Sequence, residues 1–390
     1  EGRWFSEDFV ERLSQETPSA IAPVFSVSAS AKSEQGQVVG TRLLAVDERM
    51  WSLGEGKPTR APGGVVLNGA LAEALDVSVG DSVIVRFERP DALPAQSALR
   101  AEGGLASMRL VVSDVRGEEW PFGMDLHSSG STPFNAFVSL DEVEARLGWR
   151  PLNVVLFDCE CELETIDAAI DRAWRYSDAQ LDLVKGPGWI ELQSPRVLLE
   201  PAVVTAATAV DPDSTKIASW FVDEARGVES EASYFFVSAV EGGSSSLSQG
   251  LGPKDIALSL GLAERLGLGV GDGVSLRFPI LGPRKDVLYE EAEFFVRRLF
   301  SAGDAGIDAS LMPSIPGMKG SPSCRDWEVG LPIDFNRITA EDEAFWQING
   351  GAPKALISLE TATALWSNPY GAFTAIRFSS DQSLNEVSQG

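Results

Sequence analysis

Histidine and cysteine are both scarce in this sequence. One histidine, His127, and three cysteines occur among 390 residues. Histidine is the most common proton-transfer group at neutral pH and a frequent metal ligand, so its scarcity restricts both kinds of chemistry. A Ser-His-Asp triad would have to use His127, which lies in a polar stretch typical of a loop. The sequence therefore favours a protein that is not an enzyme and that carries neither a cofactor nor a metal.

Basic residues are also in deficit. The chain has 32 Lys and Arg against 57 Asp and Glu, which gives a formal net charge of −25. Such a surface repels polyphosphate, so the composition excludes nucleic acid as a partner. The apolar fraction of 44% and the charged fraction of 23% are ordinary for a folded domain, and a chain of this length suits two domains.

Long apolar runs are absent as well. The longest, near residues 201–210, is too short and too rich in alanine to cross a bilayer. No signal peptide is recognisable. Because the sequence starts at Glu1 without Met and ends in a polar segment, residues 379–390, we expect it to be a piece of a longer protein.

The three cysteines leave two arrangements open. Cys159 and Cys161 form a Cys-x-Cys pair, which differs from the Cys-x-x-Cys of zinc and redox sites. In an oxidising compartment Cys324 could form a disulfide with Cys159 or with Cys161 and close a long loop. The alternative is three reduced, partly buried thiols.

What the sequence does contain is an internal repeat. Residues 67–87 (LNGALAEALDVSVGDSVIVRF) and 258–278 (LSLGLAERLGLGVGDGVSLRF) are identical at 11 of 21 positions without a gap. Ordinary residue frequencies would give about one or two identities. The offset between the copies is 191 residues (258 minus 67), and we interpret the match as a duplication.

Each copy of the repeat predicts a short helix, a tight turn and a strand. Leucines recur every fourth residue after Asn68, a candidate N-cap, as expected for an amphipathic helix. The Val-Gly-Asp that follows predicts a turn, in which Gly80 takes a positive φ and Asp81 bonds nearby backbone. Alternating apolar residues then predict a strand.

The flanks of the repeat extend the duplication. Residues 133–140 resemble residues 353–359, and in each a strand runs into a helix that starts at serine; Ser139 with Glu142 matches a capping box. The offset there is 219 residues (358 minus 139), so the second copy carries about 28 extra residues. Helices near residues 5–14 and 197–210 precede the hairpins, and strands at 153–157 and 373–378 close the copies.

These elements predict an α+β fold of two tandem duplicated repeats. Each has a helix, a β-hairpin, a short helix, strands, a helix and a strand, with helices packed on a mixed sheet. We place the first repeat at residues 1–190 and the second at 191–390, with an insertion at about 279–352.

The insertion holds the candidate partner-contact residues. They lie in a proline-rich segment with an aromatic anchor: Arg325, Asp326, Trp327, Glu328, Pro332 and Asp334. Alternatively, Trp327 and Trp346 anchor this segment to its own sheet, and the two interpretations are compatible. The carboxylates here could bind a divalent cation, or they are solvated charge, with Asp342 favoured by the helix dipole after Thr339.

Several segments of the sequence resemble a known protein family. The leucine helix with Val-Gly-Asp and strand, LLAVDERMW (43–51) and AFVSL (136–140) resemble the extracytoplasmic core of FtsX-like/MacB-type ABC transporter permeases. Residues 324–346 (CRDWEVGLPIDFNRITAEDEAFW), with PKALISLETATALW (353–366) and FTAIRF (373–378), resemble a subgroup with large ectodomains.

The resemblance implies a MacB periplasmic-core-like fold and a non-catalytic domain on the extracytoplasmic side of the plasma (inner) membrane. Such a domain couples ATP-driven motion of transmembrane helices to export or envelope work. Its implied partners are its own transmembrane helices, a second permease chain and a cytoplasmic ABC ATPase, with a periplasmic adaptor or a substrate protein or peptide as a further partner. The alternatives are a free-standing secreted or periplasmic binding protein and a hydrolase that uses paired carboxylates.

Overall fold

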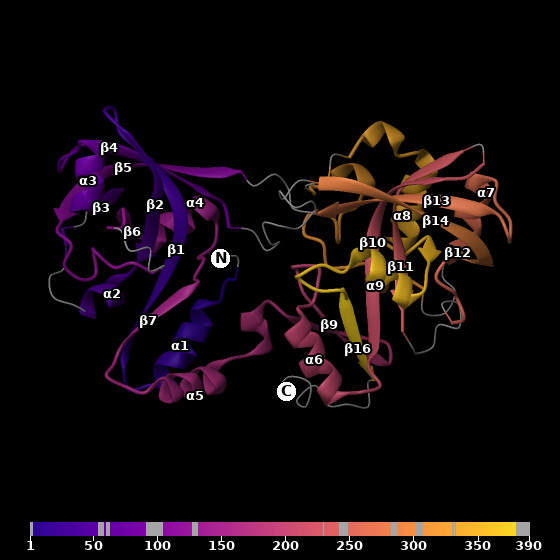
Figure 1. The fold of residues 1–390 in the computed structure, drawn as a ribbon, viewed down its shortest axis with the longest axis horizontal. Coiled ribbons are helices and arrows are strands. Elements are labelled where there is room, and N and C mark those ends of the chain that lie inside the picture. Colours follow the sequence, from indigo (N-terminus) through magenta and orange to yellow (C-terminus); the bar gives the residue numbers. More distant parts are fainter. Residues whose placement is uncertain are drawn as a thin grey trace. The chain divides into compact units, whose positions relative to one another are not determined.

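The chain divides into two compact units (Figure 1). The computed structural model describes residues 3–53, 58–59, 63–90, 104–126, 132–228, 230–241, 249–281, 287–301, 307–329, 331 and 333–379. Unit 1 comprises Glu1–Pro90 and Gly103–Ala179, and unit 2 contains Gln180–Gly390. His127 and Pro332 lie outside the described residues.

Unit 1 is built on a sheet with the strand order β2-β6-β3-β5-β4-β1-β7. Because β1 pairs with β4 and β7 on one side and with β2 on the other, six of these strands close into a ring and β7 extends from it. The strands are β1 Ala20–Lys32, β2 Gln37–Val46, β3 Gly64–Asn68, β4 Ser82–Glu88, β5 Leu105–Arg116, β6 Asn135–Ser139 and β7 Val154–Asp158.

Helices cover the ring and its extension. They are α1 Glu7–Glu16, α2 Glu48–Ser52, α3 Gly69–Leu75, α4 Leu140–Leu147 and α5 Leu163–Ala173, followed by the 3₁₀ helix η1 Tyr176–Ala179. The expected N-cap is confirmed, because the Asn68 side chain accepts from the Leu71 N–H at 3.2 Å. The expected capping box at Ser139 is wrong: Ser139 accepts from the Asp141 N–H, while the Glu142 carboxylate accepts from the Gly63 N–H.

Unit 2 repeats the strand order of unit 1, as β11-β15-β12-β14-β13-β10-β16, and adds β9 and β8 beyond β16. Its strands are β8 Asp182–Gly186, β9 Trp189–Gln193, β10 Thr215–Arg226, β11 Glu231–Val240, β12 Asp255–Ser259, β13 Gly273–Leu281, β14 Val287–Phe300, β15 Ala355–Leu356 and β16 Ala375–Ser379. Its helices are α6 Pro201–Val210, α7 Leu260–Leu266, α8 Ala340–Asn349 and α9 Leu359–Trp366, with 3₁₀ helices η2 Ala309–Leu311, η3 Cys324–Asp326 and η4 Phe335–Arg337.

Local details repeat along with the topology. The register between β3 and β5 shifts after Val65, and that between β12 and β14 shifts after Ile256, at the same offset of 191 residues (256 minus 65). The Val-Gly-Asp turns place Gly80 at φ +98° and Gly271 at φ +101°. Asp81 accepts from the Ser78 N–H at 2.8 Å, as expected from the sequence. The predicted α+β class and the duplication are therefore confirmed.

The boundaries differ from those expected at residue 190 and at residues 279–352. Strands β8 and β9 lie on the sheet of unit 2, because β9 pairs with β16, so the units divide after Ala179. Strand β14 lies within the expected insertion but is the counterpart of β5, since it pairs with β12 and β13 as β5 pairs with β3 and β4. The extra residues of unit 2 therefore follow Phe300.

Each ring encloses its own apolar core. In unit 1 the core includes Phe25 and Phe87, whose rings meet edge to face at 6.0 Å. In unit 2 Trp220 stacks on Trp366 at 6.0 Å and donates from its indole N–H to the Pro279 carbonyl at 2.9 Å. Burial of this apolar surface is the main term that stabilises both units.

Candidate functional site

The insertion of unit 2 folds over the aromatic side of β10 and β11. Trp327 and Trp346 are 6% and 8% exposed, and their rings meet edge to face at 4.9 Å. Trp327 also meets Phe221 of β10 edge to face at 6.2 Å. The indole N–H of Trp346 donates to the Ser321 carbonyl at 2.8 Å. Both tryptophans therefore anchor the insertion to its own sheet.

The other candidate contact residues lie mostly in solvent. Arg325, Asp326 and Glu328 are exposed around the buried Trp327. The backbone fixes this arrangement, because the Glu328 N–H donates to the Gly317 carbonyl at 2.9 Å. Asp334 is exposed too and caps η4, where it accepts from the Asn336 N–H at 3.0 Å. The structure thus holds an exposed, charged rim, residues 325–328, on an aromatic base.

The cysteines pair differently from either arrangement expected. A disulfide joins Cys159 to Cys161, and Cys324 is a buried free thiol of unit 2. The expected disulfide of Cys324 with Cys159 or Cys161 is therefore wrong, because the nearer cysteine takes the bond. Burial raises the pKa of Cys324 to about 12, and the charge of Glu343 adds to this effect. Such a thiol is chemically inert at neutral pH.

A buried carboxylate, Asp342, joins the insertion to the repeat. Its Oδ2 accepts from Arg265 Nη1 at 2.7 Å and its Oδ1 from Lys354 Nζ at 2.8 Å. It also completes a capping box with Thr339 at the start of α8. Because Arg265 belongs to the repeated helix α7 and Lys354 precedes β15, one side chain links three segments.

Asp342 is charged at every physiological pH. Burial opposes its charged form, but the charge of Lys354 and hydrogen bonds from Lys354, Arg265 and Thr339 outweigh burial and lower its pKa to about 2. The sequence indicated Asp342 as a candidate cation ligand or as a solvated charge near a helix start. The signal missed was its partners, Arg265 and Lys354, which are distant along the chain.

A pocket of about 520 Å³ lies between α7 and α8, beside this carboxylate. Its apolar part is formed by Leu262 and Phe345, and Lys354 Nζ lies 4.6 Å from the centre of the Phe345 ring. Glu264 and Glu341 supply acidic groups. Since α8 belongs to the insertion, the described residues of unit 1 include no counterpart of this pocket's second wall.

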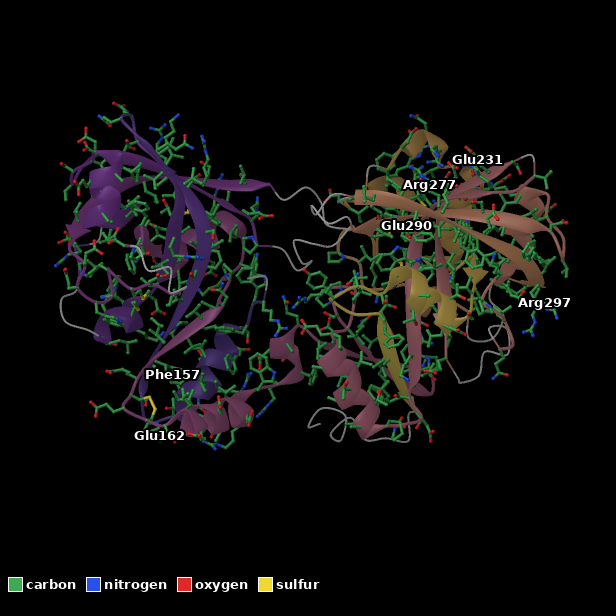
Figure 2. All side chains as sticks on the ribbon, in the orientation of Figure 1. Phe157, Glu162, Glu231, Arg277, Glu290 and Arg297 are labelled. Atoms are coloured by element: carbon green, nitrogen blue, oxygen red, sulfur yellow. A yellow bond between two sulfur atoms is a disulfide. The ribbon has the colours of Figure 1, made fainter. Side chains whose placement is uncertain are left out.

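A second group of buried charges ties η4 to the sheet of unit 2. Arg337 donates to Glu224 Oε2 at 2.5 Å, and Arg277 donates to Asp223 Oδ2 at 2.8 Å. Arg277, marked in Figure 2, also lies 4.1 Å from the centre of the Tyr289 ring. Burial raises the pKa of Asp223, although Arg277 and Arg337 act against it. The contacts of Arg337 hold η4 on β10, while the Arg277 pair joins β13 to β10 within the ring.

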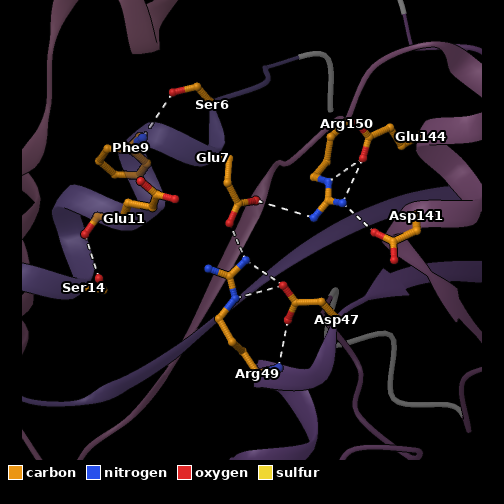
Figure 3. A network of polar contacts seen from close by, with 10 residues as sticks. All are labelled: Ser6, Glu7, Phe9, Glu11, Ser14, Asp47, Arg49, Asp141, Glu144 and Arg150. Carbon is orange, nitrogen blue, oxygen red and sulfur yellow. Dashed lines mark hydrogen bonds and ion pairs between the residues drawn. The ribbon is translucent and has the colours of Figure 1, made fainter.

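Unit 1 has its own charge network at the start of α1 (Figure 3). Arg49 pairs with Asp47 at 2.6 Å and with Glu7, and Arg150 lies 4.0 Å from Glu7. Arg150 also binds Asp141 and Glu144 of α4, at 2.5 and 2.8 Å. Burial lowers the pKa of Arg49, but hydrogen bonds to Asp47 and Glu7 outweigh it and raise that pKa above its usual value. The network holds the first helix of unit 1 against α2 and α4.

Among the described residues, no three His, Cys, Asp or Glu side chains gather as metal ligands would. The carboxylates considered for a cation are instead spread out or engaged: Asp326 and Glu328 are exposed, and both oxygens of Asp342 are bonded. The described helices also include none that is both long and apolar enough to span a membrane.

The fold and its insertion can be compared with solved proteins. The chain is similar to the extracellular domain of a noncanonic ABC-type transporter, YknZ, from Gram-positive bacteria. That match has 13% identity, a TM-score of 0.30 and covers 43% of this chain and 81% of that one.

It is also similar to the periplasmic region of MacB from Actinobacillus actinomycetemcomitans. Here the identity is 11% and the TM-score 0.27, with 42% of this chain and 71% of that one covered. No family model and no curated protein matches the sequence. At these TM-scores we draw no functional inference from the likeness.

Proposed function

We propose that this chain is the extracytoplasmic domain of an ABC transporter permease of the FtsX-like/MacB type. In this role it performs no catalysis and passes ATP-driven motion of membrane helices to export or envelope work. The support from sequence is the duplicated helix, Val-Gly-Asp turn and strand, together with residues 324–346.

The observation that carries the proposal is how each unit begins and ends. In unit 1 the Phe5 N–H, just before α1, donates to the Leu152 carbonyl, just before β7, at 2.9 Å. In unit 2 the Leu199 N–H donates to the Phe373 carbonyl at 2.8 Å in the equivalent place. The segments that lead into the first helix and into the last strand of a unit are therefore bonded to each other, and the last strand pairs with a closed ring that has a dense core. A force on one end moves the unit as a rigid body.

The proposed partners follow from this role. They are the protein's own transmembrane helices, a second permease chain and a cytoplasmic ABC ATPase. We assign the contact with an adaptor or a substrate protein to the rim of the insertion, through Arg325, Asp326 and Glu328, with Asp334 nearby and Trp327 as the buried base. Exposed charge around a packed aromatic residue is the arrangement found at many interfaces.

The test uses the full-length gene product, expressed together with a candidate ABC ATPase from the same organism. We expect the protein in the membrane fraction, this domain digested by protease from the outside, and the ATPase co-purifying with it. Recovery of the full-length protein as a soluble secreted species without an ATPase would refute the transporter role.

The contact rim has its own test in the same complex. Charge reversal at Arg325→Glu with Asp326→Lys should abolish the transport or envelope phenotype while ATP hydrolysis continues, because the rim lies on the surface. The matched control is Glu360→Lys, an exposed change in the first turn of α9. An equal effect of both variants would remove the rim as the contact.

A second candidate function, a free-standing binding protein, is favoured by the pocket between α7 and α8. Its volume of about 520 Å³ falls within the range of small-molecule sites. The membrane fractionation separates the two functions, since a free-standing binder is recovered without an ATPase.

A further inference from the structure

Strand β7 of unit 1 has an uncovered edge. Among the described residues it pairs with β1 alone, through Val154–Asp158. Its first four residues, Val-Val-Leu-Phe, are all apolar and half-buried, and they pack partly against two cores. Edge strands usually carry a charge, a proline or a bulge that prevents pairing with another chain, and residues 154–157 carry none of these.

The duplicated strand shows what covers such an edge. Strand β16 corresponds to β7, since Ala375 pairs with Ile217 as Val154 pairs with Val24. In unit 2 this edge is taken by β9, antiparallel, over five consecutive pairs from Ala375↔Gln193 to Ser379↔Trp189. The same position in the same fold therefore accepts an extended strand.

The central side chains of β16 and β7 differ, and this difference indicates which residue a strand paired with β7 carries at that position. At the centre of β16 stands Arg377, which donates to Glu191 of β9 at 2.6 Å. The equivalent residue of β7 is Leu156. A glutamate opposite Leu156 would be desolvated without a partner, so the strand that fits β7 has an apolar residue there.

The free edge of unit 2 provides a contrast. Strand β8 is the outermost strand of its sheet, and it carries Asp182 and Lys185 within five residues, with Pro187 next. These are the usual safeguards of an edge. Strand β7 has its one charge, Asp158, at its very end, so the two edges are built for different uses.

The end of β7 is strongly acidic. Asp158, Glu160, Glu162 and Glu164 are all exposed. Figure 2 marks Phe157 and Glu162, which flank the Cys159–Cys161 disulfide in the turn that follows the strand. Such a cluster attracts a basic group at the corresponding end of an incoming strand.

We propose that β7 is a strand-addition site for a partner protein. The partner supplies an extended segment that pairs antiparallel with residues 154–158, has an apolar side chain opposite Leu156, and carries a basic residue opposite Asp158. Main-chain hydrogen bonds provide affinity, and these two positions provide specificity. The site is independent of the transporter role.

The test uses the whole chain and two synthetic peptides. The first has the sequence of residues 182–193, the hairpin of β8 and β9, which presents β9 to the edge. The second differs by Trp189→Lys and Glu191→Leu, so that its lysine faces Asp158 and its leucine faces Leu156. We expect fluorescence anisotropy to show the second peptide binding about tenfold more tightly than the first. Hydrogen exchange should then slow at residues 154–158.

Two variants of the chain locate the site. Leu156→Lys should abolish binding of the second peptide, and Asp158→Lys, an exposed change, should weaken it several-fold. If Leu156→Lys fails to fold, Asp158→Lys still carries the test. Absence of saturable binding at millimolar peptide, or protection at β8 in place of β7, would overturn the proposal. So would a dimer in sedimentation that Leu156→Lys abolishes, because a second copy would then occupy β7.

Discussion

The two units share one strand order but differ in what surrounds it. Both have the closed ring, the register shift at equivalent residues and the bond between the segments that lead into the first helix and into the last strand. Unit 2 alone adds β8 and β9 on one side and the insertion with α8 on another. The copies share the ring and the elements packed on it, and they differ in the strands and the insertion added around it.

The largest effect is expected from a substitution that removes Asp342, which links the insertion to the ring of unit 2. Replacing Asp342 by alanine leaves the half-buried Arg265 and Lys354 without their carboxylate, so we expect the free energy of unfolding of unit 2 to fall by roughly 2–4 kcal/mol. Urea denaturation followed by tryptophan fluorescence measures it, since Trp327 and Trp346 lie in the insertion. Glu341→Ala, one residue away and exposed, is the control and should change stability by less than about 1 kcal/mol. Equal losses of stability in Asp342→Ala and Glu341→Ala would show that Asp342 does not link the insertion to the repeat.

Next in size is a matched pair of core substitutions. Leu71 of α3 and Leu262 of α7 are equivalent and buried, at 0% and 3% exposed, and Leu262 also borders the pocket between α7 and α8. Leu71→Ala and Leu262→Ala should each cost roughly 3 kcal/mol, because each removes the same methyl groups from equivalent cores. Calorimetry should show each variant shifting a different transition. Costs that differ by more than about 2 kcal/mol would show that the copies are packed differently despite their common topology.

The acid dependence of unit 2 follows from the same carboxylate. The pKa of Asp342 in the folded chain is about 2, below the unfolded value of about 3.9. Its contribution is therefore complete above about pH 5 and is lost progressively as the pH falls from there through 2, a change of about 2–3 kcal/mol. Denaturation of the wild type and of Asp342→Asn at pH 5 and pH 2 isolates the contribution of Asp342 to the loss of stability in acid. The same acid loss in both proteins would assign it to other groups.

The smallest effects test the repeated turn. Gly80 and Gly271 have positive φ values and open space at the Cβ position, so alanine meets no atoms and costs only backbone strain. We expect Gly80→Ala and Gly271→Ala each to lower stability by about 1 kcal/mol. Gly261→Ala, in α7 and equally open, should raise it by about half a kcal/mol. A stabilising effect at either turn would contradict the left-handed conformation described for both.

Many helices, turns and strands could be predicted from the sequence, but the pairing of segments that are far apart in the chain could not. Periodicity and the repeat located α3, α7, the turns and the first hairpins, because these depend on residues close along the chain. The ring closure and the place of β9 depend on pairs far apart in sequence, such as Arg377 with Glu191. No alternation of apolar residues encodes such a pair.

The candidate site also has features that could be predicted from the sequence and features that could not. The segment around Trp327 was recognised from its aromatic and proline content. The role of Asp342 was missed because its partners lie 77 and 12 residues away. The Cys159–Cys161 disulfide was in neither of the two arrangements considered, because the spacing of these cysteines matches no familiar motif. Glu142 was expected to bond within its own helix, but its donor is the Gly63 N–H.

The strand order has a consequence for how the chain is made. Strand β6 lies between β2 and β3, although it is synthesised after both, and β15 lies likewise between β11 and β12. Each ring therefore stays incomplete until the ribosome has translated β6 or β15. In unit 2 the insertion lengthens this interval. A nascent chain in this state exposes unpaired strands, which favours aggregation until the late strand arrives. The half-made ring is therefore the stage of synthesis at which each unit is most exposed to aggregation.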